Sequence, residues 1–134
     1  MTGRSVPGAE ARHQIANLLH TYTDIADRKD VDAAVALLGT ARVRYPAAGL
    51  EEPGEAAGFF AGLWASPLPH RHDVSNLVVV PGDVAGTWTA RAHYARWIFD
   101  PGPVLHTLGE YTIVVIEPDW AVVELTVTRT WTTV

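Results

Sequence analysis

The chain has 134 residues, which is typical of one domain, and it is 48% hydrophobic and 19% charged with a formal net charge of −5. Its ten basic residues are scattered, and no apolar run approaches the roughly 20 residues that span a bilayer, so neither nucleic-acid nor membrane binding is expected. The lack of cysteine excludes disulfides and Cys-ligated metal sites, and the polar N-terminus does not resemble a signal peptide, so a cytoplasmic location is expected.

The first segment with a clear pattern is predicted to be a long helix from about Ala9 to Arg28. Apolar residues recur there at helical spacing and form one stripe: Ile15, Leu18, Leu19, Tyr22, Ile25 and Ala26. Asp24 lies opposite this stripe on a helical wheel, whereas Asp27 lies at its edge in the last turn. A carboxylate at a helix C-terminus faces the negative end of the helix dipole, so Asp27 is expected to have a compensating partner.

Two further helices and a short strand are predicted before the middle of the chain. Asp30 can cap a second helix over residues 31–38, which Gly39 ends. Residues 42–45 form a short strand that Pro46 stops. Residues 53–65 have Pro and Glu early and bulky aromatic residues later, which predicts a third helix with an aromatic face.

The second half of the chain changes to the β-branched runs of strands. Pro-Gly-Asp, Asp-Pro-Gly-Pro and Glu-Pro-Asp separate four predicted strands, over residues 72–80, 85–99, 105–117 and 121–134. Short turns between long strands indicate an antiparallel meander. We expect an α+β fold, a cone-shaped α+β barrel in which three N-terminal helices pack on a strongly curved mixed or antiparallel sheet around a cavity. Residues 1–9 are expected to be a flexible arm and residues 10–134 a single domain.

His72, at the head of the first long strand, is the leading candidate for chemistry. Its ordinary pKa of about 6.5 suits proton transfer near neutral pH. A hydrogen bond from its imidazole to Asp27 would fix the tautomer and stabilise the imidazolium. The alternative is a structural histidine bonded to a backbone carbonyl. Strand alternation places His72 on one face with Val74, Asn76, Val78 and Val80.

The remaining histidines do not predict a metal site. His70 and His72 are the only pair with close spacing, and alternation puts both on one face, but no third ligand is evident. His93 and His106 are expected to be structural or to lie at a cavity rim. The other three histidines are expected to be exposed: His13, His20 and His70.

The order of these elements resembles the SnoaL-like branch of the nuclear transport factor 2-like superfamily, which includes polyketide cyclases, scytalone dehydratases and bile-acid dehydratases. The family pattern of a helix with Tyr, then Asp five residues later, then a second helix matches residues 15–38. Its first strand matches residues 42–45, and its His-x-x-Ser-Asn strand matches residues 71–79. Gly109-Glu110-Tyr111 resembles the Gly-x-Tyr of a later strand, and Trp120 stands where a Trp opens the last strand.

The resemblance implies which residues would do chemistry. Asp27 and His72 match the family's proton-transfer groups, and Tyr22 matches the tyrosine of the bile-acid enzymes. Tyr45 matches a tyrosine of the scytalone type, and His93 is aligned with that type's second histidine. Both tyrosines also have core packing as an alternative role. Where the scytalone type has Ser and Asn, this chain has His106 and Thr107.

The sequence therefore favours a cofactor-independent dehydratase, cyclase or isomerase acting on an apolar, polyketide-like or polycyclic carbonyl compound. Five Trp in 134 residues is a high number, and if several line one cavity the ligand is expected to be flat, apolar and ring-containing. The residues expected to contact it are Phe59, Trp64, Asn76, Trp97 and Tyr111.

Two other functions compete with this interpretation. The same cone can be a binding module without chemistry. It can also open or hydrolyse epoxides with an Asp-Arg-Asp arrangement, for which the candidates are Asp73, Glu110, Glu124, Arg91 and Arg96. The expected partner is an apolar small molecule, and a curled sheet whose outer face carries Trp and Val is expected to be covered in a homodimer or homotrimer.

Overall fold

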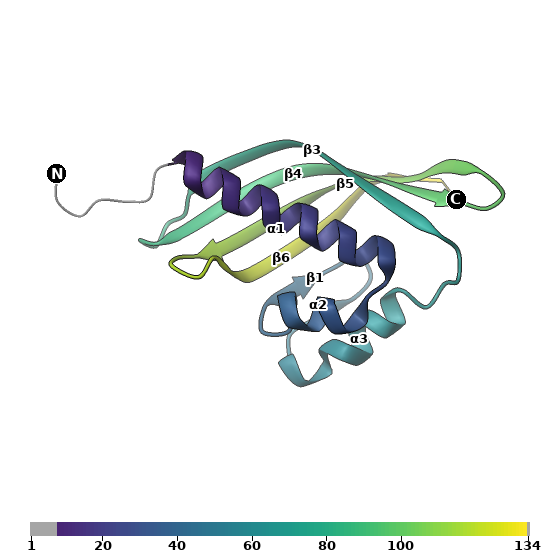
Figure 1. The fold of residues 1–134 in the computed structure, drawn as a ribbon, viewed down its shortest axis with the longest axis horizontal. Helices are drawn as coiled ribbons and strands as arrows, with labels where there is room; N and C mark the ends of the chain where they lie inside the picture. The colour runs from purple at the N-terminus through teal and green to yellow at the C-terminus, as the bar shows by residue number, and fades with distance from the viewer. Residues whose placement is uncertain (1–7, 134) are drawn as a thin grey trace.

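The computed structural model describes residues 8–133 and shows three helices packed on one face of a six-stranded sheet (Figure 1). The helices are α1 (Gly8–Arg28), α2 (Val31–Leu38) and α3 (Ala56–Leu63), the last preceded by a 3-10 turn, η1 (Pro53–Glu55). The strands are β1 (Arg42–Arg44), β2 (Gly49–Leu50), β3 (His70–Pro81), β4 (Thr87–Phe99), β5 (Pro103–Ile116) and β6 (Ala121–Thr132). The predicted α+β class is confirmed.

The four long strands form the predicted antiparallel meander, and the sheet order is β2-β1-β6-β5-β4-β3. Strand β1 pairs parallel with β6 and antiparallel with β2, so the sheet is mixed. Its two end strands do not pair with each other, and the sheet is therefore curved but not closed into a barrel. The two-residue strand β2 was not predicted, because a segment that short carries no alternation.

The helix boundaries follow local rules. Helix α1 begins at Gly8, so it includes the last two residues of the predicted arm; residues 1–7 of that arm lie outside the described residues. The Asp30 side chain accepts a hydrogen bond from the Ala33 backbone N–H, which confirms the predicted cap of α2. Gly39 ends α2 with right-handed backbone angles. Glycine is needed there because a β-carbon would collide with the Val35 carbonyl, not because φ is positive.

The predicted alternation along β3 is wrong beyond Ser75. A β-bulge interrupts pairing with β4 between Ser75 and Val78, and Asn76 adopts a positive φ of 57°. Asn tolerates this left-handed conformation better than most residues. Leu77 and Val79, not Val78 and Val80, then turn toward the protein interior. The Ser-Asn pair therefore shapes the strand.

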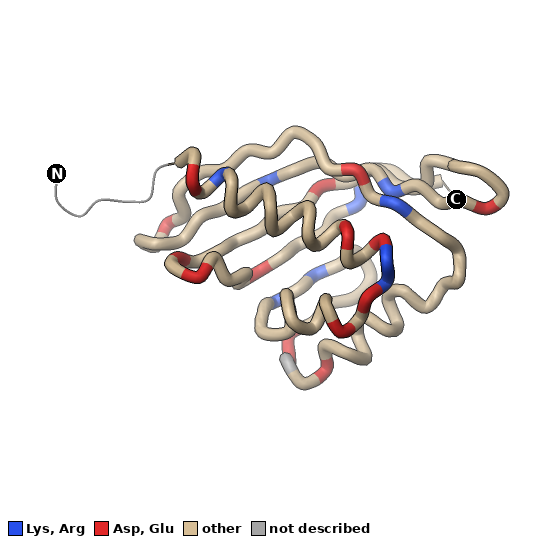
Figure 2. The backbone as a smooth tube through the Cα atoms, in the orientation of Figure 1, with Lys and Arg blue, Asp and Glu red and all other residues tan. Residues whose placement is uncertain are grey.

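The core lies between α1 and the inner face of the sheet. Ile15 and Leu19 of α1 are buried, as are Ala90 and Ala92 of β4. Small side chains on β4 leave room for the helix to lie close to the sheet. The basic residues are scattered over several elements, as expected (Figure 2). Within residues 8–133 no helix is long and apolar enough to cross a bilayer.

Candidate active site

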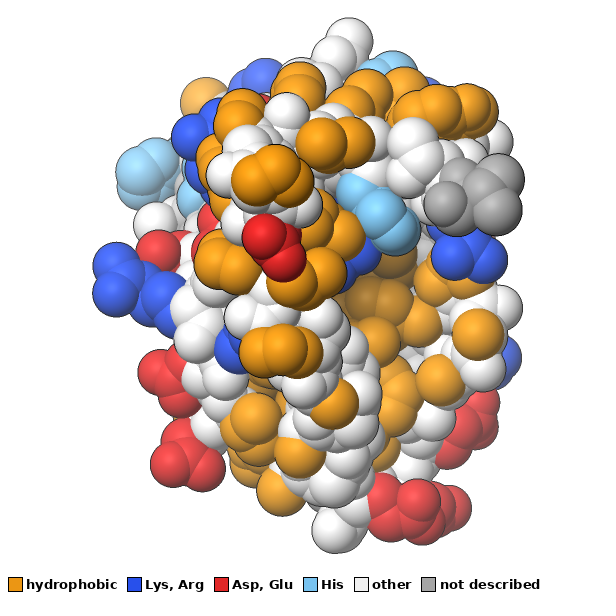
Figure 3. All heavy atoms as spheres, turned by 90° about the vertical axis from the view of Figure 1, so that its right-hand side faces the viewer, with side chains coloured by type: hydrophobic (Ala, Val, Ile, Leu, Met, Phe, Trp, Pro, Cys, Tyr) orange, Lys and Arg blue, Asp and Glu red, His pale blue; other side chains and the backbone are white. Residues whose placement is uncertain are grey.

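A cavity of about 250 Å³ opens where α1 ends and α3 leads into β3. Figure 3 looks onto this end of the molecule and shows a hollow bordered by hydrophobic side chains, with histidine and basic side chains beside it. The volume lies slightly below the range of roughly 300–1,000 Å³ typical of small-molecule sites, so a compact ligand fits. The lining combines aromatic, basic and small side chains: Tyr22, Tyr45, Tyr94, Tyr111, Trp64, His70, His72, His106, Arg96, Arg129, Thr107, Leu63, Val127, Pro46, Ala47 and Ala48.

Asp27 and His72 form a hydrogen-bonded pair at this cavity. The His72 Nδ1 lies 2.7 Å from Asp27 Oδ1, and the same oxygen accepts the His72 backbone N–H at 2.9 Å. The expected hydrogen bond between the two residues is thus confirmed. Nδ1 donates to the carboxylate, and no hydrogen bond among the described residues uses Nε2. Both side chains are shielded from solvent, with exposures of 9% for His72 and 25% for Asp27.

His70, two residues before His72, has both ring nitrogens engaged in hydrogen bonds. It is buried, not exposed as predicted, because the bend after α3 brings it under the last turn of α1. Its Nε2 lies 2.5 Å from the Ala26 carbonyl, and its Nδ1 accepts a hydrogen bond from Arg96 Nε at 3.1 Å. Burial lowers the pKa of His70 to about 4, assisted by the nearby positive charges, so the ring is neutral with the proton on Nε2.

The two histidines and Asp27 have ligand atoms within 4.8 Å of one another, a spacing that a metal ion could bridge. Asp27 is the third group that the sequence did not reveal. However, both nitrogens of His70 are already engaged, by Ala26 and by Arg96, whose positive charge would also repel a cation. This hydrogen-bonded arrangement does not fit a metal ion, because His70 has no free lone pair.

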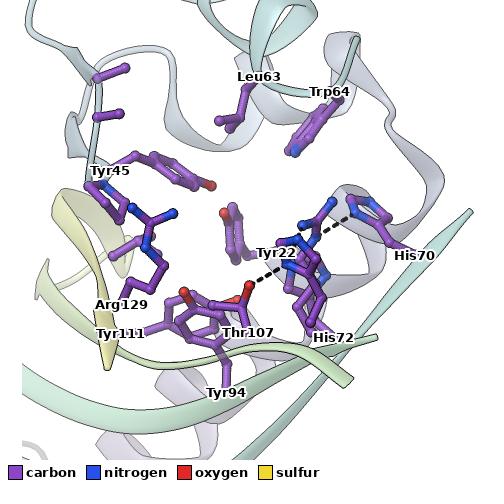
Figure 4. Close-up of a pocket in the computed structure, with 16 residues that line it drawn as sticks. Tyr22, Tyr45, Leu63, Trp64, His70, His72, Tyr94, Thr107, Tyr111 and Arg129 are labelled. Atoms are coloured by element: carbon purple, nitrogen blue, oxygen red, sulfur yellow. Dashed lines mark hydrogen bonds between the residues drawn. The ribbon is translucent and has the colours of Figure 1, made fainter. Parts of the chain in front are cut away.

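Four tyrosines surround the cavity. Tyr94 stacks on Tyr111 with ring centroids 4.5 Å apart, and Tyr22 meets the edge of Tyr111 at 5.6 Å. Burial raises the pKa of Tyr22, Tyr94 and Tyr111, so all three hydroxyls stay protonated and can donate. The Tyr45 hydroxyl is buried and has no hydrogen-bond partner within the part of the chain described. Figure 4 shows the hydroxyls of Tyr22 and Tyr45 directed toward the middle of the cavity.

The glycine of the Gly-x-Tyr pattern, Gly109, is explained by its close contact with Tyr94. A β-carbon at Gly109 would lie 2.6 Å from Cε2 of Tyr94, well inside contact distance. Only glycine lets the Tyr94 ring lie flat across β5 and stack on Tyr111. The motif therefore positions two aromatic walls of the cavity.

Five of the predicted site residues do not line the cavity: Asp27, which is joined to it through His72, and four that lie elsewhere. His93 is exposed on the opposite face of β4 from Tyr94, so the expected second histidine is not brought to the site. Asn76 is exposed at the β3 bulge, and Trp97 hydrogen-bonds to Asp73 on the outer face. Phe59 lies behind the wall, with its ring 5.9 Å from that of Tyr45. The structure brings together the rest of the predicted set: Tyr22, Asp27, Tyr45, Trp64, His72 and Tyr111.

Several lining residues were not predicted for this cavity, and Arg96 was named only as a candidate for epoxide opening. Trp88, Ala90 and Ala92 point inward along β4, and Tyr94 and Arg96 continue this alternation. The alternation of residues along the strand could therefore have predicted both. Arg129 continues the inward positions Leu125 and Val127 of β6 in the same way. The carboxylates expected for epoxide opening are absent from the described lining, and Asp73 is exposed.

Comparison with known proteins identifies a domain family that matches this chain. The sequence model of the SnoaL-like domain matches residues 7–128. No curated protein matches the chain.

Solved structures with the same fold share little sequence. A protein of unknown function with a cystatin-like fold from Nostoc punctiforme has a TM-score of 0.79 at 11% identity, covering 94% of this chain and 95% of its own. A candidate scytalone dehydratase from Novosphingobium aromaticivorans has a TM-score of 0.74 at 16% identity, covering 93% and 87%. ActVI-ORFA from Streptomyces coelicolor has a TM-score of 0.73 at 12% identity, covering 88% and 96%.

Proposed function

The chain belongs to the SnoaL-like domain family, and from that premise and the geometry of the cavity we propose that it is a cofactor-independent acid–base enzyme. The reaction is dehydration, cyclisation or isomerisation of a compact, ring-containing carbonyl compound. The observation that carries the proposal is the Asp27–His72 pair, in which Asp27 holds Nδ1 of a histidine that lines the cavity.

His72 acts as the general base in this proposal. Its Nε2 removes a proton from the carbon next to the substrate carbonyl, and the resulting imidazolium is balanced by the Asp27 carboxylate 2.7 Å from Nδ1. The same group then returns the proton. Delivery to a leaving hydroxyl completes a dehydration, and delivery to another carbon completes an isomerisation.

Tyrosine hydroxyls stabilise the negative charge that develops on the carbonyl oxygen. Tyr45 is the strongest candidate, because its buried hydroxyl has no partner among the described residues and would gain one from the substrate. Tyr22 is the second, since its hydroxyl faces the same space and stays protonated. Donors held ready before the reaction stabilise an oxyanion without the cost of reorganisation.

Proton abstraction can be tested without knowing the product. Wild-type protein is incubated in D2O with bicyclic ketones such as 1-tetralone and 2-tetralone, and deuterium uptake at the carbon next to the carbonyl is followed by NMR. We expect His72→Asn to slow the enzyme-dependent exchange by about 10²- to 10⁴-fold, the usual contribution of a positioned acid–base group. Asp27→Asn should slow it by about 10- to 100-fold, because the carboxylate orients the base without contacting the substrate.

The matched control is His93→Asn, which removes a histidine from the opposite face of β4 and should leave exchange unchanged. Thermal unfolding of each variant shows that its fold is intact. Exchange that survives in His72→Asn would refute the proton-transfer role. Ketones that bind without any exchange would instead identify a binding module.

A further inference from the structure

Two arginines at the cavity, Arg96 and Arg129, have no carboxylate partner within residues 8–133. Several exposed arginines form ion pairs, among them Arg28 with Asp24, Arg44 with Glu51 and Arg71 with Asp73, and the exposed Arg12 and Arg91 form none in the described part of the chain. Around Arg96 and Arg129 no carboxylate of the described residues lies within ion-pair distance. An exposed arginine needs no anionic partner, but Arg96 is half-buried and shares its cavity with Arg129, and within residues 8–133 neither has a carboxylate at ion-pair distance.

Arg96 is half-buried and held in place by neutral groups. Its Nε donates to His70 Nδ1 at 3.1 Å, and its Nη1 donates to His106 Nδ1 at 3.2 Å. His70 is itself fixed by the Ala26 carbonyl. The guanidinium is therefore positioned by acceptors that carry no charge, and its remaining N–H groups are available. Burial of a cation without an anion is unfavourable, and it lowers the pKa of Arg96.

Arg129 reaches the same region from β6. The positive charges of Arg96 and Arg129 both lower the pKa of His106, whose pKa burial already lowers, and both oppose the burial that raises the pKa of Tyr94. Figure 4 shows the Arg129 guanidinium directed into the cavity between Tyr45 and Tyr111. The lining formed by the described residues contains Arg96 and Arg129 but no carboxylate, and Asp27 beside it is engaged by His72.

We propose that the cavity selects a ring-containing carboxylic acid, whose carboxylate binds to Arg96 and Arg129 while its ring lies against the aromatic wall. A guanidinium matches a carboxylate with two parallel hydrogen bonds, and the anion offsets the desolvation of Arg96. The flat surface of stacked Tyr94 and Tyr111 supplies the contact for the ring. The inference rests on the proposed function in one respect: it takes the carboxylic acid to be the substrate class. It replaces the purely apolar substrate expected from the sequence.

Binding is measured by isothermal titration calorimetry with three probes: 2-naphthoate, its neutral isostere 2-naphthamide, and inorganic phosphate. We expect 2-naphthoate to bind about 10- to 100-fold more tightly than the amide, the range for hydrogen bonds to a charged group. Phosphate, which carries charge without a ring, should bind more weakly than 2-naphthoate. Equal binding of acid and amide, or no binding of the acid at millimolar concentration, would overturn the inference.

Variants assign the preference to the cavity arginines. Arg96→Gln should abolish most of the preference for the acid over the amide, and Arg129→Gln should reduce it by a smaller factor because that side chain is more exposed. Retained binding of the amide shows that each variant is folded. Arg91→Gln is the matched control, since Arg91 lies exposed on the opposite face of the same strand and should not matter. A preference unchanged in both Arg96→Gln and Arg129→Gln would refute the proposal.

His72→Asn separates this inference from the proposed chemistry. The variant should lose deuterium exchange but keep its preference for 2-naphthoate. Loss of acid selectivity in the arginine variants with normal exchange on neutral ketones supports the anion site by itself. Normal exchange in His72→Asn refutes the chemistry and leaves the anion site standing.

Discussion

The inner face of the sheet is divided between two regions that the same strands build in different ways. Strand β4 contributes Ala90 and Ala92 to the core, where they belong to the same buried cluster as Ile15 and Leu19 of α1. Farther along the same strand, Tyr94 and Arg96 occupy equivalent inward positions but border a cavity. The direction of the side chains is the same in both regions. What differs is their size and polarity, and whether a helix covers them.

The comparison shows how one domain separates stability from function. The filled region has apolar side chains at close contact, and it supplies most of the burial that stabilises the fold. The open region keeps polar groups that pair only in part with one another. The Tyr45 hydroxyl and His72 Nε2 make no hydrogen bond among the described residues, and the Tyr45 hydroxyl is directed into the cavity (Figure 4). A substitution should therefore affect stability in one region and ligand binding or turnover in the other.

The filled region should be the more sensitive to lost volume. Ile15 is fully buried on α1, so Ile15→Ala should lower the free energy of unfolding by about 2–5 kcal/mol, because it removes apolar contacts and leaves a cavity. Urea denaturation followed by circular dichroism measures the change. In the open region, Tyr94→Phe removes only a hydroxyl that faces the cavity and should change stability by less than about 1 kcal/mol. Equal losses in the two variants would contradict the division.

The free energy of unfolding should depend on pH through His70, which lies at the border between the two regions. Its pKa is about 4 in the folded protein and about 6.5 in the unfolded chain, so between these values the unfolded chain binds more protons. This contribution to stability is complete above the unfolded value, declines as the pH falls through that window, and amounts to about 3 kcal/mol at most.

The pH effect of His70 is isolated by comparing unfolding curves of wild type and His70→Gln from neutral pH to pH 4. The variant should lose less stability on acidification, whatever its stability at neutral pH. His20→Gln, which changes an exposed histidine of α1, should follow the wild-type curve. Parallel curves for wild type and His70→Gln would show that His70 is not held neutral.

The smallest effect is expected at Tyr45, where stability and function should change in opposite directions. Tyr45→Phe removes a buried hydroxyl without a partner in the described structure and should leave stability equal or higher by up to about 1 kcal/mol. The same change removes a donor to the substrate carbonyl and should slow deuterium exchange. A variant with lower stability and normal exchange would mean that the hydroxyl serves the fold.

Local patterns in the sequence were sufficient for the helices, the meander and the central pair of site residues. The stripe on α1, the cap at Asp30 and the turns between the strands are short-range features, and each was confirmed. The Asp27–His72 contact joins residues 45 positions apart; the place of Asp27 at the helix end suggested it, and the family resemblance supplied its role. One error arose where a bulge in β3 changes the direction of the side chains. There the bulge turns Asn76 out to the surface.

The sequence by itself determined which residues form helices and strands and which side chains are suited to move a proton, because both depend on residue type and on near neighbours. The tertiary structure decided which of them meet. It buried His70 and occupied both of its nitrogens, and it joined Nδ1 of His72 to Asp27. It also brought Arg96 and Arg129 from different strands to one cavity. Burial and charge compensation depend on all neighbours in space, so only the folded chain defines them.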